Sequence, residues 1–515
     1  MNVTADPITN RYIFGDVPPR ATLPLKKLGA RFDTDLSRWV ATPHTVLNDF
    51  LKKAGAKTLL PPLDVPARKD VTYHEKTAIQ LFPYQETGAA FIRENPNVLL
   101  ADDMGLGKTF QAIYGTAHLS HVLVVCPAAA KYQWADACRR AGFSASVIEG
   151  RKPAVYVSPR QEQYTIINYD ILSDHVPYLN RNGFDVVVLD EGHYIKNRLS
   201  KRTKAALSLK APKRYILTGT PLLNRPDELW SQLAFLNRLP PLYASWAKFT
   251  DRYCGAWDAP WGRDTSGATH TKELAAYLNT FTLRRTKEEV LPDLPERRRE
   301  VLHLPLKSSE YDKAETDFVA WYKGETGKDL THSDAQLMVR IGQLRQLAEA
   351  AKVQWAAHFL QDYDTNKHPI VVFYSFKDTK NALLKAFPNA LTIHGAQTSL
   401  QKQEAVDAFW KGESSILLAQ TESAQTALNL QCSDTTLFLT YPWTPASFRQ
   451  AEDRIYRIGQ KNAVTTYTVE AFSIDTYAAE MLQDKQNVLQ NFLSGDIGPI
   501  DAHRQLAKKI LANRA

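Results

Sequence analysis

The stretch "LLADDMGLGKTF", residues 99–110, decides the fold. A short apolar run of strand type leads into a glycine turn, and a helical pattern begins directly after the turn. Gly105 and Gly107 allow backbone N–H groups to close around phosphate oxygens, and the helix N-terminus adds a partial positive charge. In such a loop Lys108 meets the β- and γ-phosphates, and Thr109 ligates Mg²⁺. The stretch therefore predicts a nucleotide-binding α/β domain.

A second strand end supports this prediction. The strict phosphate-loop pattern has a glycine where Asp102 stands, so a plain glycine turn between strand and helix is the alternative. In "VVVLDEGH" (186–193), however, an apolar strand ends on two carboxylates. Asp190 is suited to hold Mg²⁺ and Glu191 to orient or deprotonate the attacking water, although two acids also commonly cap a helix. The glycine loop upstream favours the catalytic interpretation. "LTGTP" (217–221) brings hydroxyls to another strand end facing the same crevice, although Thr-Gly-Thr-Pro is also good turn chemistry.

Short apolar runs alternate with helical patterns along most of the chain, which is typical of parallel sheets covered on both faces. The alternation stops and then begins again after about residue 365, so we expect an α/β fold with two lobes in tandem. The first set of strand-type runs is "NVLLA" (97–101), "HVLVVCP" (121–127), "TIINY" (165–169), "DVVVLDE" (185–191) and "RYILTGT" (214–220), and the second is "HPIVVFYS", "ALTIHG", "SSILLAQ" and "TTLFLTY".

The predicted domain organisation has five parts. A small β-rich module and a linker occupy 1–70, the first lobe 71–295, a helical region between the lobes 296–365, the second lobe 366–475, and a helical tail 476–515.

Composition narrows the class of protein. At 515 residues the chain is long enough for two or three domains, and its net charge of +8 suits a polyanionic partner. The four cysteines are widely scattered, which predicts neither a disulfide framework nor a zinc site. We find no signal-peptide pattern and no apolar run of membrane-spanning length, so we expect a cytoplasmic protein that does not contact membranes.

A polar pattern near the end of the second lobe needs an explanation. In "QAEDRIYRIGQ" (450–460), Gln450, Arg454 and Arg457 stand at i, i+4 and i+7, which on a helix places them along one face. A solvated helix face is the ordinary interpretation. The alternative is that a negatively charged group reaches this face.

Taken together, these segments resemble those of the Swi/Snf-type ATPases, a helicase-like branch of superfamily two. The resemblance covers about residues 81–460. Its segments occur in the family's order: "LFPYQETGAAF", "DDMGLGKT", "VVCPAAAKYQW", "DEGH", "ILTGTPLLN", "LRRTKEEVLPDLP", "LRQL", "IHGAQTSLQKQEAVDAF" and "QAEDRIYRIGQ".

The resemblance implies two RecA-like lobes with an ATP cleft between them, and ATP and Mg²⁺ as ligands. It implies that Gln85 reads the adenine edge, that Arg454 and Arg457 are arginine fingers, and that Gln450 lies near the γ-phosphate. Lys108, Asp190 and Glu191 would be catalytic, with Thr109 and Asp190 at the metal. The remaining nucleotide-binding positions would be Asp103, Met104, Gly105, Leu106 and Gly107.

Some positions depart from the family pattern. Asp102 fits the family pattern, because the family usually has an acidic residue at this position. Asp103 stands where Glu is commoner. Ala424 and Ala427 replace two glycines of a GGxGLNL-like segment. Thr440 stands where Asp is usual, and Lys402 replaces an Arg and so loses bidentate geometry. These changes bear on the coupling of hydrolysis to movement more than on ATP binding.

The resemblance also implies a DNA partner, double-stranded or branched, and a motor that grips phosphates rather than base edges. Candidate contacts are Lys131, Lys196, Arg198, Arg284, Arg285 and Arg345. "LKKLGARFDTDLSRWVAT" (25–42), with Gly29 and Trp39, resembles a small module at the ends of bacterial and phage proteins. It would bind DNA or a protein partner, or simply cap the first lobe.

Three functions remain open at this point. The leading one is a monomeric, ATP-dependent translocase on double-stranded DNA, in a bacterial nucleoid or a phage-infected cell. A strand-separating DNA or RNA helicase shares the same ATPase segments. The third is a DNA-binding scaffold subunit whose ATPase has decayed, a reading that the two missing glycines favour and that the intact Lys108 opposes.

Overall fold

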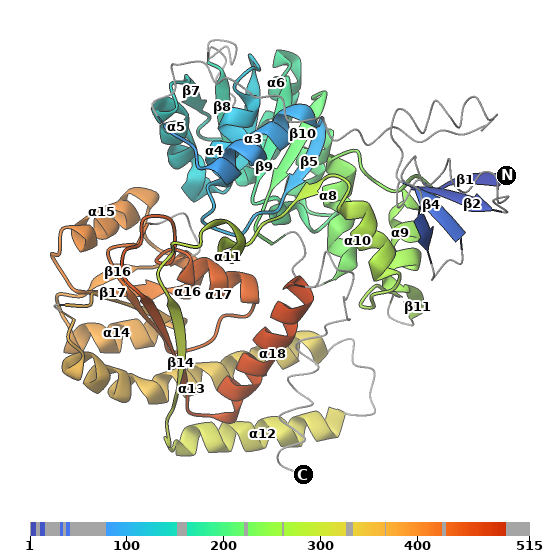
Figure 1. Cartoon of the computed structure of the whole chain (residues 1–515). Helices are drawn as coiled ribbons and strands as arrows, with labels where there is room; N and C mark the ends of the chain where they lie inside the picture. The colour runs from blue at the N-terminus through green and yellow to red at the C-terminus, as the bar shows by residue number, and fades with distance from the viewer. Residues whose placement is uncertain are drawn as a thin grey trace.

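The computed structural model describes residues 2–6, 11–15, 31–33, 38–41, 79–151, 162–220, 225–259, 262–325, 333–365, 367–424 and 429–490. Two parallel sheets form two lobes that follow one another along the chain, as predicted (Figure 1). The predicted linker, Pro221, Ala427 and the end of the predicted tail after residue 490 lie outside the described residues.

The first lobe is built on seven parallel strands in the order β13-β5-β10-β9-β6-β8-β7. Alternate residues of these apolar strands enter two separate cores, one on each face. Val98 and Leu100, for example, enter one core and Leu99 the other. The strands are β5 (Asn97–Leu100), β6 (Val122–Cys126), β7 (Ala145–Val147), β8 (Tyr164–Asn168), β9 (Val186–Asp190), β10 (Lys213–Leu217) and β13 (Thr282–Leu283).

Helices cover both faces of this sheet because each has one apolar stripe to bury. On one face lie α3 (Pro83–Glu94), α4 (Lys108–Thr116) and α5 (Lys131–Arg140). On the other lie α6 (Tyr169–Asn182), α7 (Lys201–Ser208), α8 (Leu229–Phe235), α9 (Trp246–Cys254) and α10 (Thr271–Leu278). A short hairpin, β11 (Trp257–Ala259) and β12 (Gly262–Asp264), and the short helix α11 (Lys287–Val290) complete the lobe.

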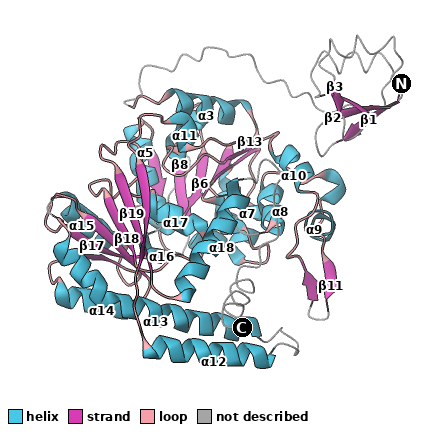
Figure 2. Ribbon diagram, turned by 60° about the horizontal axis from the view of Figure 1, so that its bottom comes forward, coloured by secondary structure: helices cyan, strands magenta, loops and turns pink. Residues whose placement is uncertain are grey.

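The second lobe has six parallel strands in the order β14-β19-β18-β15-β17-β16. The strands are β14 (Arg297–His303), β15 (Ile370–Tyr374), β16 (Leu391–Ile393), β17 (Ile416–Gln420), β18 (Thr435–Phe438) and β19 (Val464–Glu470). Helices α13 (Ser333–Asp362) and α14 (Lys377–Ala386) cover one face, and α15 (Ser399–Trp410), α17 (Pro445–Glu452) and α18 (Ser473–Gln490) the other (Figure 2). Helix α12 (Ser309–Glu325) packs along α13, and the one-turn helix α16 (Thr421–Ala424) follows β17.

The region predicted as helical, 296–365, differs from that expectation at its start. Residues Arg297–His303 form β14, which pairs in parallel with β19 and lies at the edge of the second sheet. Its sequence, "RRREVLH", lacks the apolar run used to recognise the other strands, and most of it is exposed. Charged residues on an edge strand discourage pairing with other chains. This explains why the strand is rich in charged residues, a composition that resembles a helix or a linker more than a buried strand.

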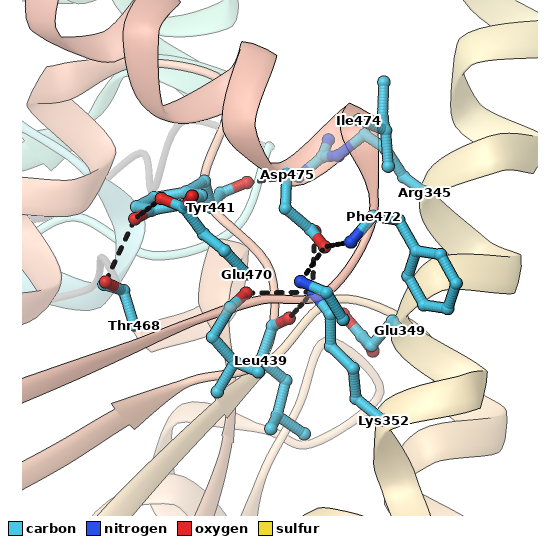
Figure 3. A network of polar contacts seen from close by, with 12 residues as sticks. Arg345, Glu349, Lys352, Leu439, Tyr441, Thr468, Glu470, Phe472, Ile474 and Asp475 are labelled. Atoms are coloured by element: carbon cyan, nitrogen blue, oxygen red, sulfur yellow. Dashed lines mark hydrogen bonds and ion pairs between the residues drawn. The ribbon is translucent and has the colours of Figure 1, made fainter. Parts of the chain in front are cut away.

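A buried charge network fixes α13 to the second sheet (Figure 3). Arg345, Glu349 and Lys352 stand at i, i+4 and i+7 and so face the same way. The Lys352 ammonium donates to Asp475 Oδ1 (2.6 Å) and to carbonyls in β19 and just after β18 (3.0 and 2.8 Å). Glu349 accepts from the backbone N–H groups of residues 375 and 376, at the start of α14 (2.9–3.1 Å). The part of α13 that carries these three residues therefore belongs structurally to the second lobe.

The N-terminal strands form a four-stranded antiparallel sheet in the order β1-β2-β4-β3, which confirms the predicted β-rich module. The strands are β1 (Asn2–Asp6), β2 (Arg11–Gly15), β3 (Arg31–Asp33) and β4 (Arg38–Ala41). Trp39 stands opposite both Phe14 and Phe32 in the register. Across the part of the chain that the structure describes, every helix is too short or too polar to cross a membrane.

Candidate nucleotide site between the lobes

The strand register brings the predicted segments of the first lobe to one edge of its sheet. Leu217 in β10 pairs with Leu100 on one side and with Asp190 on the other. The glycine loop after β5, the carboxylates after β9 and the threonines after β10 therefore emerge next to one another. This is the carboxyl edge, where parallel α/β sheets bind ligands.

The glycine loop has a conformation that other residues would disturb. Gly105 and Gly107 have φ values of +82° and +72°, in the left-handed region that favours glycine. A Cβ on Gly107 would lie 2.3 Å from Gln85 Nε2, and one on Gly105 would lie 3.4 Å from Arg457 Cβ. The loop thus meets Gln85 on one side and the second lobe on the other.

The side chain of Lys108 points back into the glycine loop that precedes it in the chain. Its ammonium donates to the carbonyl oxygens of Asp102 (2.8 Å) and Asp103 (3.2 Å). Thr109 is the second residue of α4 and is half-buried. The loop therefore gathers a cation, a hydroxyl and the N-terminus of α4, which together suit a phosphate chain.

The acidic residue at the first glycine position of the phosphate-loop pattern has a structural role. Asp102 is fully buried, and its carboxylate pairs with Arg285 Nη2 (2.5 Å) and accepts from Gln111 Nε2 (3.0 Å). The pair fastens the loop to the segment after β13. Arg285, predicted as a DNA contact, is instead a partner of this buried carboxylate.

Gln85 also lies against the loop. It is buried, donates from Nε2 to the carbonyl of Leu106 (3.2 Å), and accepts at Oε1 from the Phe82 N–H (3.1 Å). Met104 packs on Gly219, where a Cβ would lie 2.8 Å from Met104 Cγ. The predicted nucleotide-binding residues of the first lobe are thus gathered in one place.

The two carboxylates at the end of β9 have different environments. Asp190 accepts from Trp134 Nε1 at Oδ2 (2.8 Å) and from the Glu191 N–H at Oδ1 (3.1 Å). Glu191 Oε2 lies 3.3 Å from His193 Nδ1, which also lies 3.2 Å from Thr218 Oγ1. Glu191 has φ +50°, an unusual conformation for a non-glycine residue and one that tends to occur at functional sites. Trp134 and His193 were not singled out from the sequence.

These environments separate the two acidities. Burial and the neighbouring Glu191 charge raise the pKa of Asp190 to about 6. Burial acts in the same direction on Glu191, but His193 and the positive charges of Lys108 and Arg454 outweigh it, so the pKa of Glu191 is lowered. Two adjacent carboxyls with opposite shifts are typical of a pair with divided roles.

The raised pKa of Asp190 predicts a stability cost. Because the folded-state pKa (about 6) exceeds the ordinary value (3.8), stability falls as the pH rises through this interval. Asp190→Asn keeps an oxygen acceptor for Trp134 and is expected to raise the free energy of unfolding by about 1–3 kcal/mol above pH 7. The gain should shrink toward zero near pH 4. Denaturant titrations at both pH values measure this, and a gain independent of pH would contradict it.

The arginines of the second lobe do not lie on the helix that their spacing predicts. Helix α17 contains Gln450, which is buried, but ends at Glu452, and the arginines lie in the turns that follow. The Arg454 carbonyl accepts from the N–H of Leu430 (2.9 Å), a residue from another part of the lobe. This external bond takes the acceptor that a continuing helix would use, so the sequence period alone was misleading.

The turn nevertheless brings its arginines to the first lobe. Burial and the adjacent Arg457 lower the pKa of Arg454 to about 10, while Glu191 and Asp190 act on it in the opposite direction. Arg454 therefore lies within electrostatic range of the carboxylate pair. Arg457 Cβ lies 3.4 Å from where a Cβ of Gly105 would be. Both arginines are thus close to the predicted nucleotide site of the first lobe.

The other predicted DNA contacts do not form one cluster of free cations. Arg345 is buried, stacks on Trp443 (4.1 Å from the ring centroid) and donates to the Tyr441 carbonyl, so its prediction as a DNA contact was wrong. The others belong to the first lobe. Lys131 donates to a carbonyl (3.4 Å), Lys196 pairs with Glu228 (3.5 Å), Arg198 stacks on Trp246 (4.1 Å), and Arg284 is half-buried.

Two departures from the family pattern have a visible setting. Thr440 is buried, and its hydroxyl has no hydrogen-bond partner among the described residues. Lys402 is half-buried, and burial lowers its pKa. Ala424 ends α16, directly before the residues that the structure does not describe.

Known protein families match both lobes. The family described as "SNF2-related domain" matches residues 72–353, and the family described as "Helicase conserved C-terminal domain" matches residues 351–459. The match thus extends over the glycine loop, the carboxylate pair and the arginine turn.

Individual relatives share about 30% of the aligned residues with this chain. The SWI/SNF-related matrix-associated actin-dependent regulator of chromatin subfamily A-like protein 1 of Xenopus tropicalis is 30% identical over 466 residues, covering 87% of this chain and 48% of that protein. The DNA annealing helicase and endonuclease ZRANB3 of Bos taurus is 28% identical over 447 residues, covering 82% and 41%. The chain spans less than half the length of these two relatives.

Among solved structures, the Sulfolobus solfataricus SWI2/SNF2 ATPase core in complex with dsDNA is 22% identical, with a TM-score of 0.41, and covers 83% of this chain and 96% of that chain. The family assignment rests on the sequence match instead. Since the SNF2-related match alone spans more than half of the chain, and the residues gathered at the sheet edge fall within it, this protein belongs to the SNF2-related family, with a helicase C-terminal domain forming its second lobe.

Proposed function

We propose that this protein is an ATP-dependent motor that moves along double-stranded or branched DNA. The observation that carries the proposal is the approach of Arg454 and Arg457, from the second lobe, to the glycine loop and carboxylate pair of the first. Two lobes that share one hydrolytic site change their relative position when the site is occupied and emptied. That movement is the means by which hydrolysis displaces the protein along a duplex.

The residues of the first lobe fit a nucleotide and its metal. Oxygen donors are what Mg²⁺ prefers; Thr109, at the start of α4, supplies a hydroxyl, and Asp190, at the end of β9, supplies a carboxylate. When bound, Mg²⁺ neutralises part of the phosphate charge. Lys108 exchanges its loop carbonyls for phosphate oxygens, and Gln85 recognises the adenine edge. Glu191, kept ionised by its neighbours, orients the attacking water and accepts its proton.

The second lobe supplies positive charge for the transition state. Arg454 and Arg457 stabilise the charge that develops on the transferred γ-phosphoryl group, and such arginine fingers contribute roughly 10³–10⁵ in rate in other phosphoryl-transfer systems. Gln450, in α17, lies near the γ-phosphate. Because the arginines belong to the second lobe, hydrolysis is fast only when both lobes are engaged.

DNA is the partner that best suits the charge and the relatives. The net charge of +8 favours a polyanion, and the name of one relative describes a DNA annealing helicase. We propose that the protein acts as a monomer and that the N-terminal module contacts DNA or a protein partner.

The test is ATP hydrolysis in the presence of duplex, forked and single-stranded DNA and of RNA. We expect duplex or forked DNA to stimulate turnover most. The logarithm of the stimulation should fall linearly with the logarithm of the salt concentration. Stimulation by single-stranded DNA or RNA alone would favour a strand-separating helicase. Hydrolysis no faster than that of Lys108→Ala would favour a scaffold with a decayed ATPase.

A further inference from the structure

Lys287 is a buried lysine in the first lobe that none of the roles above uses. It is the first residue of α11 and is 3% exposed. Its backbone N–H donates to Asp103 Oδ2 in the glycine loop (3.3 Å). Thr286 and Glu289 form a capping box around it, which fixes the start of α11. Lys287 is therefore held rigidly to the loop that is proposed to grip phosphate.

The side chain of Lys287 reaches the second lobe. Its ammonium donates to Asp453 Oδ1 (2.5 Å) and to the carbonyl oxygen of Tyr456 (2.6 Å). Asp453 directly precedes Arg454, and Tyr456 directly precedes Arg457. One ammonium group thus contacts the residue that precedes each of the two arginines, through the side chain of Asp453 and the backbone of Tyr456.

Gly105 makes this approach possible. A Cβ at this position would lie 3.3 Å from Lys287 Cε, 3.4 Å from Lys287 Nζ and 3.4 Å from Arg457 Cβ. A side chain there would push against the lysine and the arginine turn together. The glycine loop, Lys287 and the arginine turn consequently meet at one point.

The turn is held from its own lobe as well. Arg299 in β14 donates to both oxygens of Glu452 (2.8 and 2.5 Å), whose side chain is fully buried. Glu452 ends α17, so Arg299 fixes the base of the turn while Lys287 fixes its two arginine-bearing positions. The Lys287 contacts with Asp453 and Tyr456 cross from the first lobe to the turn, so they depend on how the lobes are placed.

We propose that Lys287 is a positioning residue that sets Arg454 and Arg457 against the phosphate-binding loop. This inference rests on the proposed function, because it assigns the group that aligns the arginine fingers for hydrolysis. When the lobes separate, the Lys287–Asp453 contact breaks and both arginines leave together. When the lobes meet, the contact re-forms and returns both arginines at once.

The test compares kcat and KM for ATP in the 515-residue chain with duplex DNA. Lys287→Met removes the ammonium but keeps much of the stem, and Asp453→Asn removes the charge but keeps the shape. Both are expected to lower kcat at least tenfold and to leave KM within threefold, because the residues that bind nucleotide are unchanged. The double variant should be no slower than Lys287→Met alone, since both changes break one contact.

A matched control removes another lysine–aspartate pair. Lys367 pairs with Asp364 at 3.1 Å, but Lys367 is 79% exposed and lies in the second lobe, outside the site. Exposed pairs contribute little, so Lys367→Met should keep kcat within twofold of the unmodified protein. If Lys287→Met does not fold, Asp453→Asn alone decides the question.

Three results would overturn the inference. The first is an unchanged kcat in Lys287→Met or Asp453→Asn beside an active unmodified protein, which leaves the proposed function standing. The second is a loss of kcat that merely follows a loss of folded protein in thermal unfolding. The third is an unmodified protein no more active than Lys108→Ala, which defeats the proposed function and this inference with it.

Discussion

Replacing Arg454 or Arg457 with alanine is expected to lower DNA-stimulated kcat by roughly 10³-fold, the effect of an arginine finger in other phosphoryl-transfer systems. Both side chains come from the second lobe, yet Arg454 lies within electrostatic range of Glu191 and Asp190, and Arg457 lies against Gly105. In the proposed mechanism their positive charge acts on the γ-phosphoryl group mainly as its charge develops, so ATP binding should change far less than turnover.

The measurement is steady-state hydrolysis with saturating duplex DNA, together with direct binding of a fluorescent ATP analogue. Arg298→Ala is the control, because this arginine is 58% exposed and pairs with Glu296 on the surface. It should retain turnover within twofold. A decrease of less than tenfold in both arginine variants would mean that the second lobe does not take part in hydrolysis.

Glu191→Gln is the second substitution expected to have a large effect. A lowered pKa keeps the Glu191 carboxylate ionised at neutral pH, so it can accept the proton of the attacking water. Glutamine has a similar shape but cannot accept that proton, and loss of a general base typically costs 10²–10⁴-fold in rate. We expect kcat to fall by about 10³-fold while ATP and DNA still bind.

Single-turnover experiments separate the chemical step from binding and product release. Lys108→Ala provides the contrast, since it should weaken ATP binding itself. If Glu191→Gln keeps more than about a tenth of the single-turnover rate, Glu191 is not the base. The unusual backbone at Glu191, with φ +50°, would then need another explanation.

The lobes and most of the first-lobe site could be predicted because their signals are local. Each central strand is a short apolar run, and the glycine loop and the carboxylate pair are contiguous segments placed directly after strands. The register of parallel strands then brings them together without further information.

The remaining features depend on contacts between distant segments. Asp102 and Arg285 are 183 positions apart, and Lys287 and Asp453 are 166 apart. A buried charge and an exposed charge look the same in a sequence, so Arg285 and Arg345 were mistaken for surface contacts. The turn after α17 likewise includes a hydrogen bond from the Leu430 N–H to the Arg454 carbonyl, which no local period reveals.

The most direct test of the account is an experimental structure of the protein with duplex DNA, Mg²⁺, ADP and aluminium fluoride, which imitates the transferred phosphoryl group. We predict that the guanidinium groups of Arg454 and Arg457 lie within hydrogen-bond distance of the fluoride ligands, about 2.7–3.1 Å. The Lys287–Asp453 contact should be present in that structure. A fluoroaluminate surrounded only by first-lobe residues, with both arginines directed elsewhere, would contradict the account.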